Sequence, residues 1–110
     1  MFDCDIDTGI EPARRVYISG PITGKPNGNA ELFAQASAWV TNQGHIPINP
    51  HWLKHDHGKS WLEFMRVDLK AMMDCDEILM LPGFTDSKGA MVEHELARTL
   101  GLPIKHFLAG

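Results

Sequence analysis

Four short apolar segments alternate along this chain with three longer segments of helical periodicity, and that order constrains the fold most. The strand-like segments cover residues 16–19, 45–48, 78–81 and 104–108. The helical segments begin near Ala30, Ser60 and Lys88. Strands that alternate with helices over short connections form a parallel sheet with right-handed crossovers. The sequence therefore predicts a small three-layer α/β fold of flavodoxin or Rossmann type, with four or five parallel strands and helices on both faces of the sheet.

The three helical segments carry their own start and stop signals. Gly44 supplies a left-handed stop for the first. Ser60 and Glu63 have the form of a capping box at the start of the second. Ser87 is placed to cap the third, and Gly101 closes it. In such sheets a ligand sits beyond the carboxyl ends of the strands. Residues 20–29, 49–59 and 82–89 are the loops expected to meet there.

Length and charge limit the partners. With 110 residues, the chain is expected to form one domain over residues 14–110, preceded by an irregular arm over residues 1–13. So small a domain offers a shallow pocket, which predicts a homodimer or a larger homo-oligomer. The net charge of −4 and the absence of a basic stripe argue against a nucleic-acid polymer as partner. No apolar run reaches the ~20 residues that span a bilayer, so we expect a cytoplasmic protein without a membrane partner.

Two carboxylates occupy positions where a helix is expected to be apolar. Asp68 lies on the stripe formed by Trp61, Met65 and Met72. Glu93 lies on the stripe formed by Gly89, Leu96, Ala97 and Leu100. A desolvated carboxylate must be hydrogen-bonded, paired or protonated, and such groups cluster at functional sites. The alternative for each acid alone is a place at the edge of its stripe, with a salt bridge to solvent-exposed neighbours.

Other chemically interesting residues give weaker signals. The glycine-rich segment 19–24 and the turn at Ser87 place backbone amides where an anion can approach, although both also suit ordinary turns and caps. The three histidines at positions 51, 55 and 57 match no zinc spacing, so neither a metal nor another cofactor is expected. His94 is expected at the surface. Cys4 and Cys75 are expected to be free thiols without a nucleophilic role.

The order and spacing of several short motifs resemble the nucleoside 2-deoxyribosyltransferase superfamily. The motifs are Tyr17-Ile18-Ser19-Gly20-Pro21, then Asp68-Leu69 with Asp76 eight residues after Asp68, then Ser87-x-Gly89-x-x-x-Glu93. The resemblance spans residues 15–108. It is closest to a compact phage and bacterial branch, and more distantly similar to the deoxynucleoside 5′-monophosphate N-glycosidases.

The resemblance implies a reaction at the anomeric carbon of a small-molecule nucleoside or nucleotide. Glu93 matches the family's nucleophile, which forms a covalent glycosyl intermediate, and Asp68 matches the aspartate that assists at the sugar and the departing base. Serine at position 87, where nucleoside-using members carry an acid, implies a 5′-monophosphate. By the same resemblance the expected substrate-binding residues are Tyr17, Ser19, Gly20, Pro21, Ile22, Gly24, Ser87 and Gly89.

Two other interpretations stay open. A non-catalytic module can use the same pocket to sense or sequester a nucleotide. Leu81-Pro82-Gly83 before a glutamate-bearing helix is also similar to phosphoribohydrolases that activate cytokinins, although their glycine-threonine-x-x-glutamate motif is missing.

Overall fold

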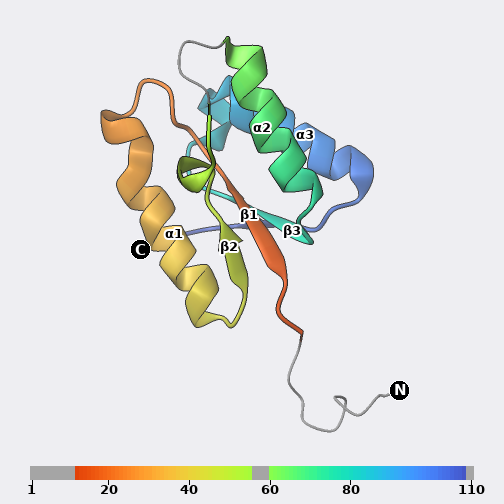
Figure 1. Ribbon diagram of the computed structural model, residues 1–110. Coiled ribbons are helices and arrows are strands. Elements are labelled where there is room, and N and C mark those ends of the chain that lie inside the picture. Colours follow the sequence, from red (N-terminus) through yellow and green to blue (C-terminus); the bar gives the residue numbers. More distant parts are fainter. Residues whose placement is uncertain (1–11, 56–59, 109–110) are drawn as a thin grey trace, which may run out of the picture.

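The computed structural model describes residues 12–55 and 60–108, and in them a parallel sheet is enclosed by helices (Figure 1). The strand order is β2-β1-β3-β4, and the expected α/β class with helices on both faces is confirmed. Of the expected amino-terminal arm, residues 1–11 lie outside the described residues. The strands are β1 (Arg15–Ser19), β2 (Ile46–Ile48), β3 (Glu77–Met80) and β4 (Ile104–His106). The longer helices are α1 (Ala30–Asn42), α2 (Trp61–Met73) and α3 (Lys88–Leu100), and short 3-10 turns cover Pro26–Asn29 (η2), Pro50–Trp52 (η3) and Phe84–Asp86 (η4).

Alternation along β1 divides the core into two layers, because successive side chains of a strand point to opposite faces. Val16 and Ile18 pack with α1 on one face. Tyr17 packs with residues of α2 and α3 on the other. Figure 1 shows the same division, with α1 on one side of the sheet and α2 and α3 together on the opposite side. The carboxylates of α2 and α3 therefore lie on the Tyr17 side of the sheet.

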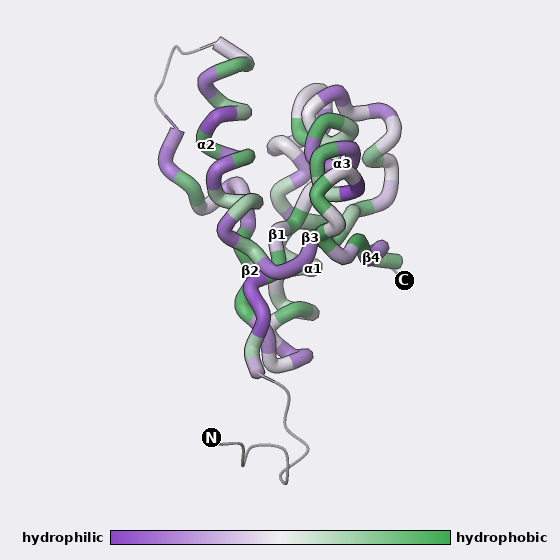
Figure 2. Tube along the Cα trace, turned by 90° about the vertical axis from the view of Figure 1, so that its right-hand side faces the viewer, coloured by the Kyte–Doolittle hydropathy of each residue, from purple (hydrophilic) through white to green (hydrophobic). Residues whose placement is uncertain are grey.

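The expected caps are present. The hydroxyl of Ser60 accepts the backbone N–H of Glu63 at 3.3 Å, and the hydroxyl of Ser87 accepts that of Ala90 at 3.2 Å. Gly44 and Gly101 have φ values of 85° and 78°, as left-handed stops require. Hydrophilic and hydrophobic residues alternate along α2 in Figure 2, as expected for a helix with one buried face.

Two residues of the expected inward stripes, Trp61 and Leu100, are more exposed than predicted, and the large apolar side chain of Trp39 on α1 is exposed as well. Trp39 is 43% exposed, Trp61 43% and Leu100 54%. Trp39 packs at the edge of α1 against Phe107 instead of under the helix. Trp61 and Leu100 are the first residue of α2 and the last residue of α3, so each lies at a helix end and not in the middle of a buried face. The stripes are therefore shorter than the periodicity indicates.

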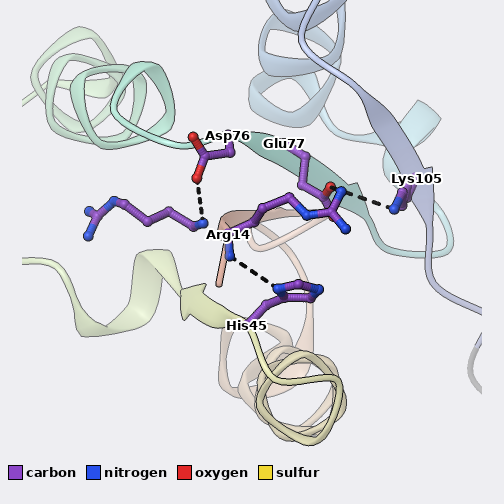
Figure 3. Close-up of polar contacts among 6 residues, drawn as sticks. Arg14, His45, Asp76, Glu77 and Lys105 are labelled. Carbon is purple, nitrogen blue, oxygen red and sulfur yellow. Dashed lines mark hydrogen bonds and ion pairs between the residues drawn. The ribbon is translucent and has the colours of Figure 1, made fainter. Parts of the chain in front are cut away.

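A cluster of charged residues joins the strands at the amino-terminal end of the sheet (Figure 3). Glu77, at the start of β3, is buried and pairs with Arg14 at 3.2 Å and Lys105 at 3.6 Å. The backbone N–H of Arg14 donates to Nδ1 of His45. This end is thus occupied by structural ion pairs. None of the helices in the described ranges combines the length and apolarity needed to cross a bilayer.

Candidate active site

A cavity of about 280 Å³ opens at the carboxyl-terminal end of the sheet. It lies beside the ends of β1 and β3, which are neighbours in the sheet. The helix that follows β1, α1, covers one face of the sheet, and the helix that follows β3, α3, covers the other. Ligands of open α/β sheets bind at such a switch point. The residues that line the cavity are Tyr17, Gly20, Ile22, Thr23, Pro50, Trp61, Phe64, Met65, Asp68, Ser87, Gly89, Ala90 and Glu93.

Two hydroxyl groups from β1 hold the carboxylate of Glu93. The Tyr17 hydroxyl donates to Oε2 at 2.8 Å, and the Ser19 hydroxyl donates to Oε1 at 2.6 Å. Tyr17 and Ser19 are two residues apart on a strand, so both side chains point to the face that α3 covers. Glu93 is 5% exposed. Each oxygen of this carboxylate is therefore fixed by its own donor.

Burial raises the pKa of Glu93 to about 7, because removal from water disfavours the charged form. The hydrogen bonds from Ser19 and Tyr17 act in the opposite direction and lower this pKa, and the negative charge of Asp68 raises it. The pKa of Tyr17 is raised well above 10.0, first by burial and then by the nearby Glu93. Near neutral pH, Glu93 is consequently available in both protonation states while Tyr17 remains a hydrogen-bond donor.

Asp68 lies on α2 across the same cavity. It is 8% exposed, and burial raises its pKa above 3.8. Nε2 of His55 lies 2.7 Å from Oδ1 of Asp68, and this contact lowers the pKa. The structure thus brings both sequence-predicted carboxyl groups to one cavity, each with a raised pKa and each with its own hydrogen-bond partners. Carboxyl groups in different environments on either side of a pocket are suited to separate acid and nucleophile roles.

Aromatic rings form one wall of the cavity. Trp61 and Phe64 come from the first turn of α2. The ammonium group of Lys88 lies 4.2 Å from the centroid of the Trp61 ring. Flat apolar surfaces next to two carboxyl groups suit a ligand that combines a planar ring with a polar portion.

Small residues allow the elements around the cavity to approach closely. A Cβ atom at Gly20 would lie 2.7 Å from Cβ of Leu81, where β1 and β3 end side by side. A Cβ atom at Gly89 would lie 3.3 Å from Sδ of Met65, between α2 and α3. Ser87 lines the cavity at the amino terminus of α3, whose backbone N–H groups and dipole favour an anion.

The expected substrate-binding residues divide into two groups. Tyr17, Gly20, Ile22, Ser87 and Gly89 line the cavity. Ser19, Pro21 and Gly24 lie outside its lining. The hydroxyl of Ser19 instead donates a hydrogen bond to the carboxylate of Glu93. Pro21 is buried against the turn that contains Gly83, and Gly24 has no heavy atom within 4 Å of its would-be Cβ, because the loop has turned toward solvent there.

Sequence reasoning missed several residues around the cavity. His55 belongs to a loop without periodicity, so no pattern connected it to Asp68. Phe64 stacks on His55, with ring centroids 4.8 Å apart, and its four-residue spacing from Asp68 on α2 was the available signal.

Away from the cavity, His94 differs from expectation because its ring stacks on Phe84 and its Nδ1 atom is buried without a partner among the described residues. Burial raises the pKa of Cys75 to about 11.

In residues 12–55 and 60–108, no group of three or more His, Cys, Asp or Glu side chains is arranged to hold a metal ion. His57 and Cys4 lie outside these ranges.

Comparison with known proteins gives a family and a fold. The family model described as Domain of unknown function (DUF4406) matches residues 14–106. The solved 2-deoxyribosyltransferase of the psychrotolerant bacterium Bacillus psychrosaccharolyticus superposes with a TM-score of 0.67 at 19% sequence identity, covering 84% of this chain and 71% of that chain. A search of curated proteins found no match. The expected resemblance is thus confirmed at the level of the fold.

Proposed function

The chain belongs to the DUF4406 family, and from that premise we propose that it cleaves or transfers the N-glycosidic bond of a nucleoside or a nucleoside 5′-monophosphate. The observation that carries this proposal is the position of Glu93, held by Tyr17 and Ser19 at the cavity that Asp68 also lines. The shared fold with a 2-deoxyribosyltransferase supports the same chemistry.

The proposed reaction uses the two carboxyl groups in different protonation states. The carboxylate of Glu93 forms a bond to C1′ of the sugar as the bond from C1′ to the base nitrogen breaks. The base takes the electron pair of that bond, and Asp68 supplies the proton that the leaving nitrogen requires. Water or a second base then attacks C1′, the bond from C1′ to Glu93 breaks, and the carboxylate of Asp68 takes the proton that the attacking group loses. A pair of acids with separated environments is what an oxocarbenium-like transition state requires.

The proposed substrate carries a 5′-phosphate. Ser87 faces the cavity with a hydroxyl group at the amino terminus of a 13-residue helix, where the helix dipole attracts negative charge. Trp61 and Phe64 offer flat surfaces for the base. Nucleoside-using relatives carry an acid at this position, and its negative charge would repel a phosphate. Serine carries no such charge.

Base release tests this function directly. We expect the purified protein to release free base from at least one 2′-deoxynucleoside 5′-monophosphate, followed by chromatography, with slower release from the matching nucleoside. Glu93→Gln keeps the size of the side chain and removes the nucleophile, so release should fall by at least about 10³-fold.

Glu95→Gln is the matched control, because Glu95 lies on the same helix, is exposed and pairs with Arg98. It should retain wild-type turnover. Tight binding of a nucleotide without base release by the wild type would favour the non-catalytic sensing module instead. Release by Glu93→Gln at the wild-type rate would contradict the nucleophile assignment.

A further inference from the structure

His55 pairs with Asp68 beside the cavity, and the proposed reaction gives His55 no role. Nε2 of His55 lies 2.7 Å from Oδ1 of Asp68. Both side chains are largely buried, with 17% and 12% of their surface exposed. Within the part of the chain that the structure describes, Oδ2 of Asp68 makes no hydrogen bond to protein. That second oxygen is therefore the one available to a ligand.

Residues of α2 itself hold the His55 ring. Phe64 and Asp68 are four residues apart, so they lie on one face of the helix. The Phe64 ring stacks on the imidazole at an interplanar angle of 25°, while the Asp68 carboxylate contacts its Nε2. The imidazole of His55 thereby connects the loop that follows η3 to the cavity wall.

We propose that His55 is a positioning residue for the acid of the reaction: it donates its Nε2–H to Oδ1 of Asp68 and leaves the proton on Oδ2 directed to the departing base. This inference rests on the proposed function. When the bond from C1′ to the base nitrogen breaks, the Oδ2 proton passes to that nitrogen, and the resulting carboxylate keeps the hydrogen bond from Nε2 of His55. The hydrogen bond strengthens as the charge develops, which is the condition for lowering a barrier.

The surrounding charges support this direction of transfer. The hydrogen bond and charge of His55 lower the pKa of Asp68, which burial otherwise raises. His51, from η3, acts in the same direction. Across the cavity, Asp68 raises the pKa values of Glu93 on α3 and Tyr17 on β1. His55 therefore offsets the burial that would otherwise make Asp68 a poor acid.

Two variants separate the hydrogen bond from the ring. His55→Leu removes the donor, whereas His55→Gln places an amide N–H close to the position of Nε2. With a 2′-deoxypurine 5′-monophosphate, we expect kcat of His55→Leu to fall on the order of 10²-fold while KM changes less than about threefold. The alkaline limb of its pH profile should move to higher pH. His55→Gln should restore most of kcat and return the alkaline limb close to its wild-type position.

The leaving group supplies the readout that a merely structural role would not move. A purine methylated on N7 already carries positive charge and departs without a proton, so His55→Leu should cleave the N7-methylated nucleotide within about threefold of wild type. His106→Leu, at an exposed histidine of β4, is the control for loss of an imidazole. Folding of each variant is verified by its thermal midpoint.

The outcomes separate the two proposals. If wild type releases base and His55→Leu matches it, or is impaired equally on both substrates, the role of His55 is overturned and the proposed function stands. If wild type releases no base from either substrate, the proposed function is overturned and the role of His55 with it. Selective loss on the unmethylated substrate, with recovery in His55→Gln, supports both.

Discussion

At Glu93, burial raises the pKa of a carboxyl group from 4.5 to about 7 in the folded protein. A group that binds its proton more tightly when folded stabilises the protein less as the pH rises, because the unfolded chain ionises first. Glu93 should therefore cost stability progressively between about pH 4.5 and pH 7, and the full cost should remain above that window. A residue kept for chemistry at the expense of stability is typical of an active site.

We predict that Glu93→Gln gains stability relative to wild type as the pH is raised. Denaturant unfolding at pH 5 and pH 8 should show the difference in free energy of unfolding between variant and wild type growing by roughly 2 kcal/mol. Glu95→Gln should show no such growth, because Arg98 lowers the pKa of Glu95 and keeps it ionised throughout. A constant difference between Glu93→Gln and wild type would contradict the raised pKa.

Tyr17 provides a second prediction at the scale of a residue. Its hydroxyl donates to Glu93 and lowers the pKa of that carboxyl group. Tyr17→Phe removes the donor, so the acidic limb of kcat/KM, which reports ionisation of the nucleophile, should move to higher pH. Ser19→Ala should move it in the same direction. A limb that stays in place, or moves to lower pH, would show that another group controls the profile.

Some of these residues could be predicted from the sequence, and others could not. Asp68 and Glu93 were detectable because a carboxyl group on an apolar stripe violates the helical pattern. The contact of Tyr17 and Ser19 with Glu93 was only partly predictable. Strand alternation places both side chains on one face of the sheet, but it does not identify the helix that covers that face. His55 had no signal, because a loop residue is positioned by tertiary contacts alone.

Among the elements, the junction between the ends of β1 and β3 is the tightest part of the site. Gly20 is buried, and a Cβ atom there would come within 2.7 Å of Leu81. A Cβ atom at Gly24 would meet open space, but a residue that carries one would have to adopt a φ of +82° there. These two glycines of one loop therefore separate the effect of crowding from that of backbone conformation.

We predict that Gly20→Ala costs more stability than Gly24→Ala. Overpacking at Leu81 should cost about 1–3 kcal/mol, and the backbone of Gly20 would have to shift as well, whereas a left-handed alanine at Gly24 costs about 1–2 kcal/mol. Gly20→Ala should also weaken nucleotide binding, because Gly20 lines the cavity and Gly24 does not. Thermal melts and binding titrations of both variants would measure this. Equal effects would mean that the β1–β3 junction can relax.

Caps were the most predictable property of the elements. Ser60, Ser87, Gly44 and Gly101 act locally, and each occupies the position its chemistry requires. The exposure of Trp39 was not predictable in the same way, since it depends on where the edge of the sheet falls. Periodicity defines a helix face, whereas only the assembled sheet defines how far that face is covered.

At the scale of the whole molecule, the two ends of the sheet differ in character. The carboxyl-terminal end holds the cavity with Asp68 and Glu93. The amino-terminal end holds Glu77 between Arg14 and Lys105 beside a second cavity of about 250 Å³ (Figure 3). The parallel sheet was predictable from the alternation of strands and helices. The strand order β2-β1-β3-β4 was not, because it depends on contacts between segments distant in sequence.

A crystal structure of Glu93→Gln with a 2′-deoxynucleoside 5′-monophosphate tests the central claim most directly. We expect C1′ at about 3–3.5 Å from the side chain at position 93, the distance of a reactive approach, with the base beside Asp68 and the phosphate at Ser87. A nucleotide bound at the Arg14 and Lys105 end of the sheet, or one whose sugar faces away from position 93, would contradict it.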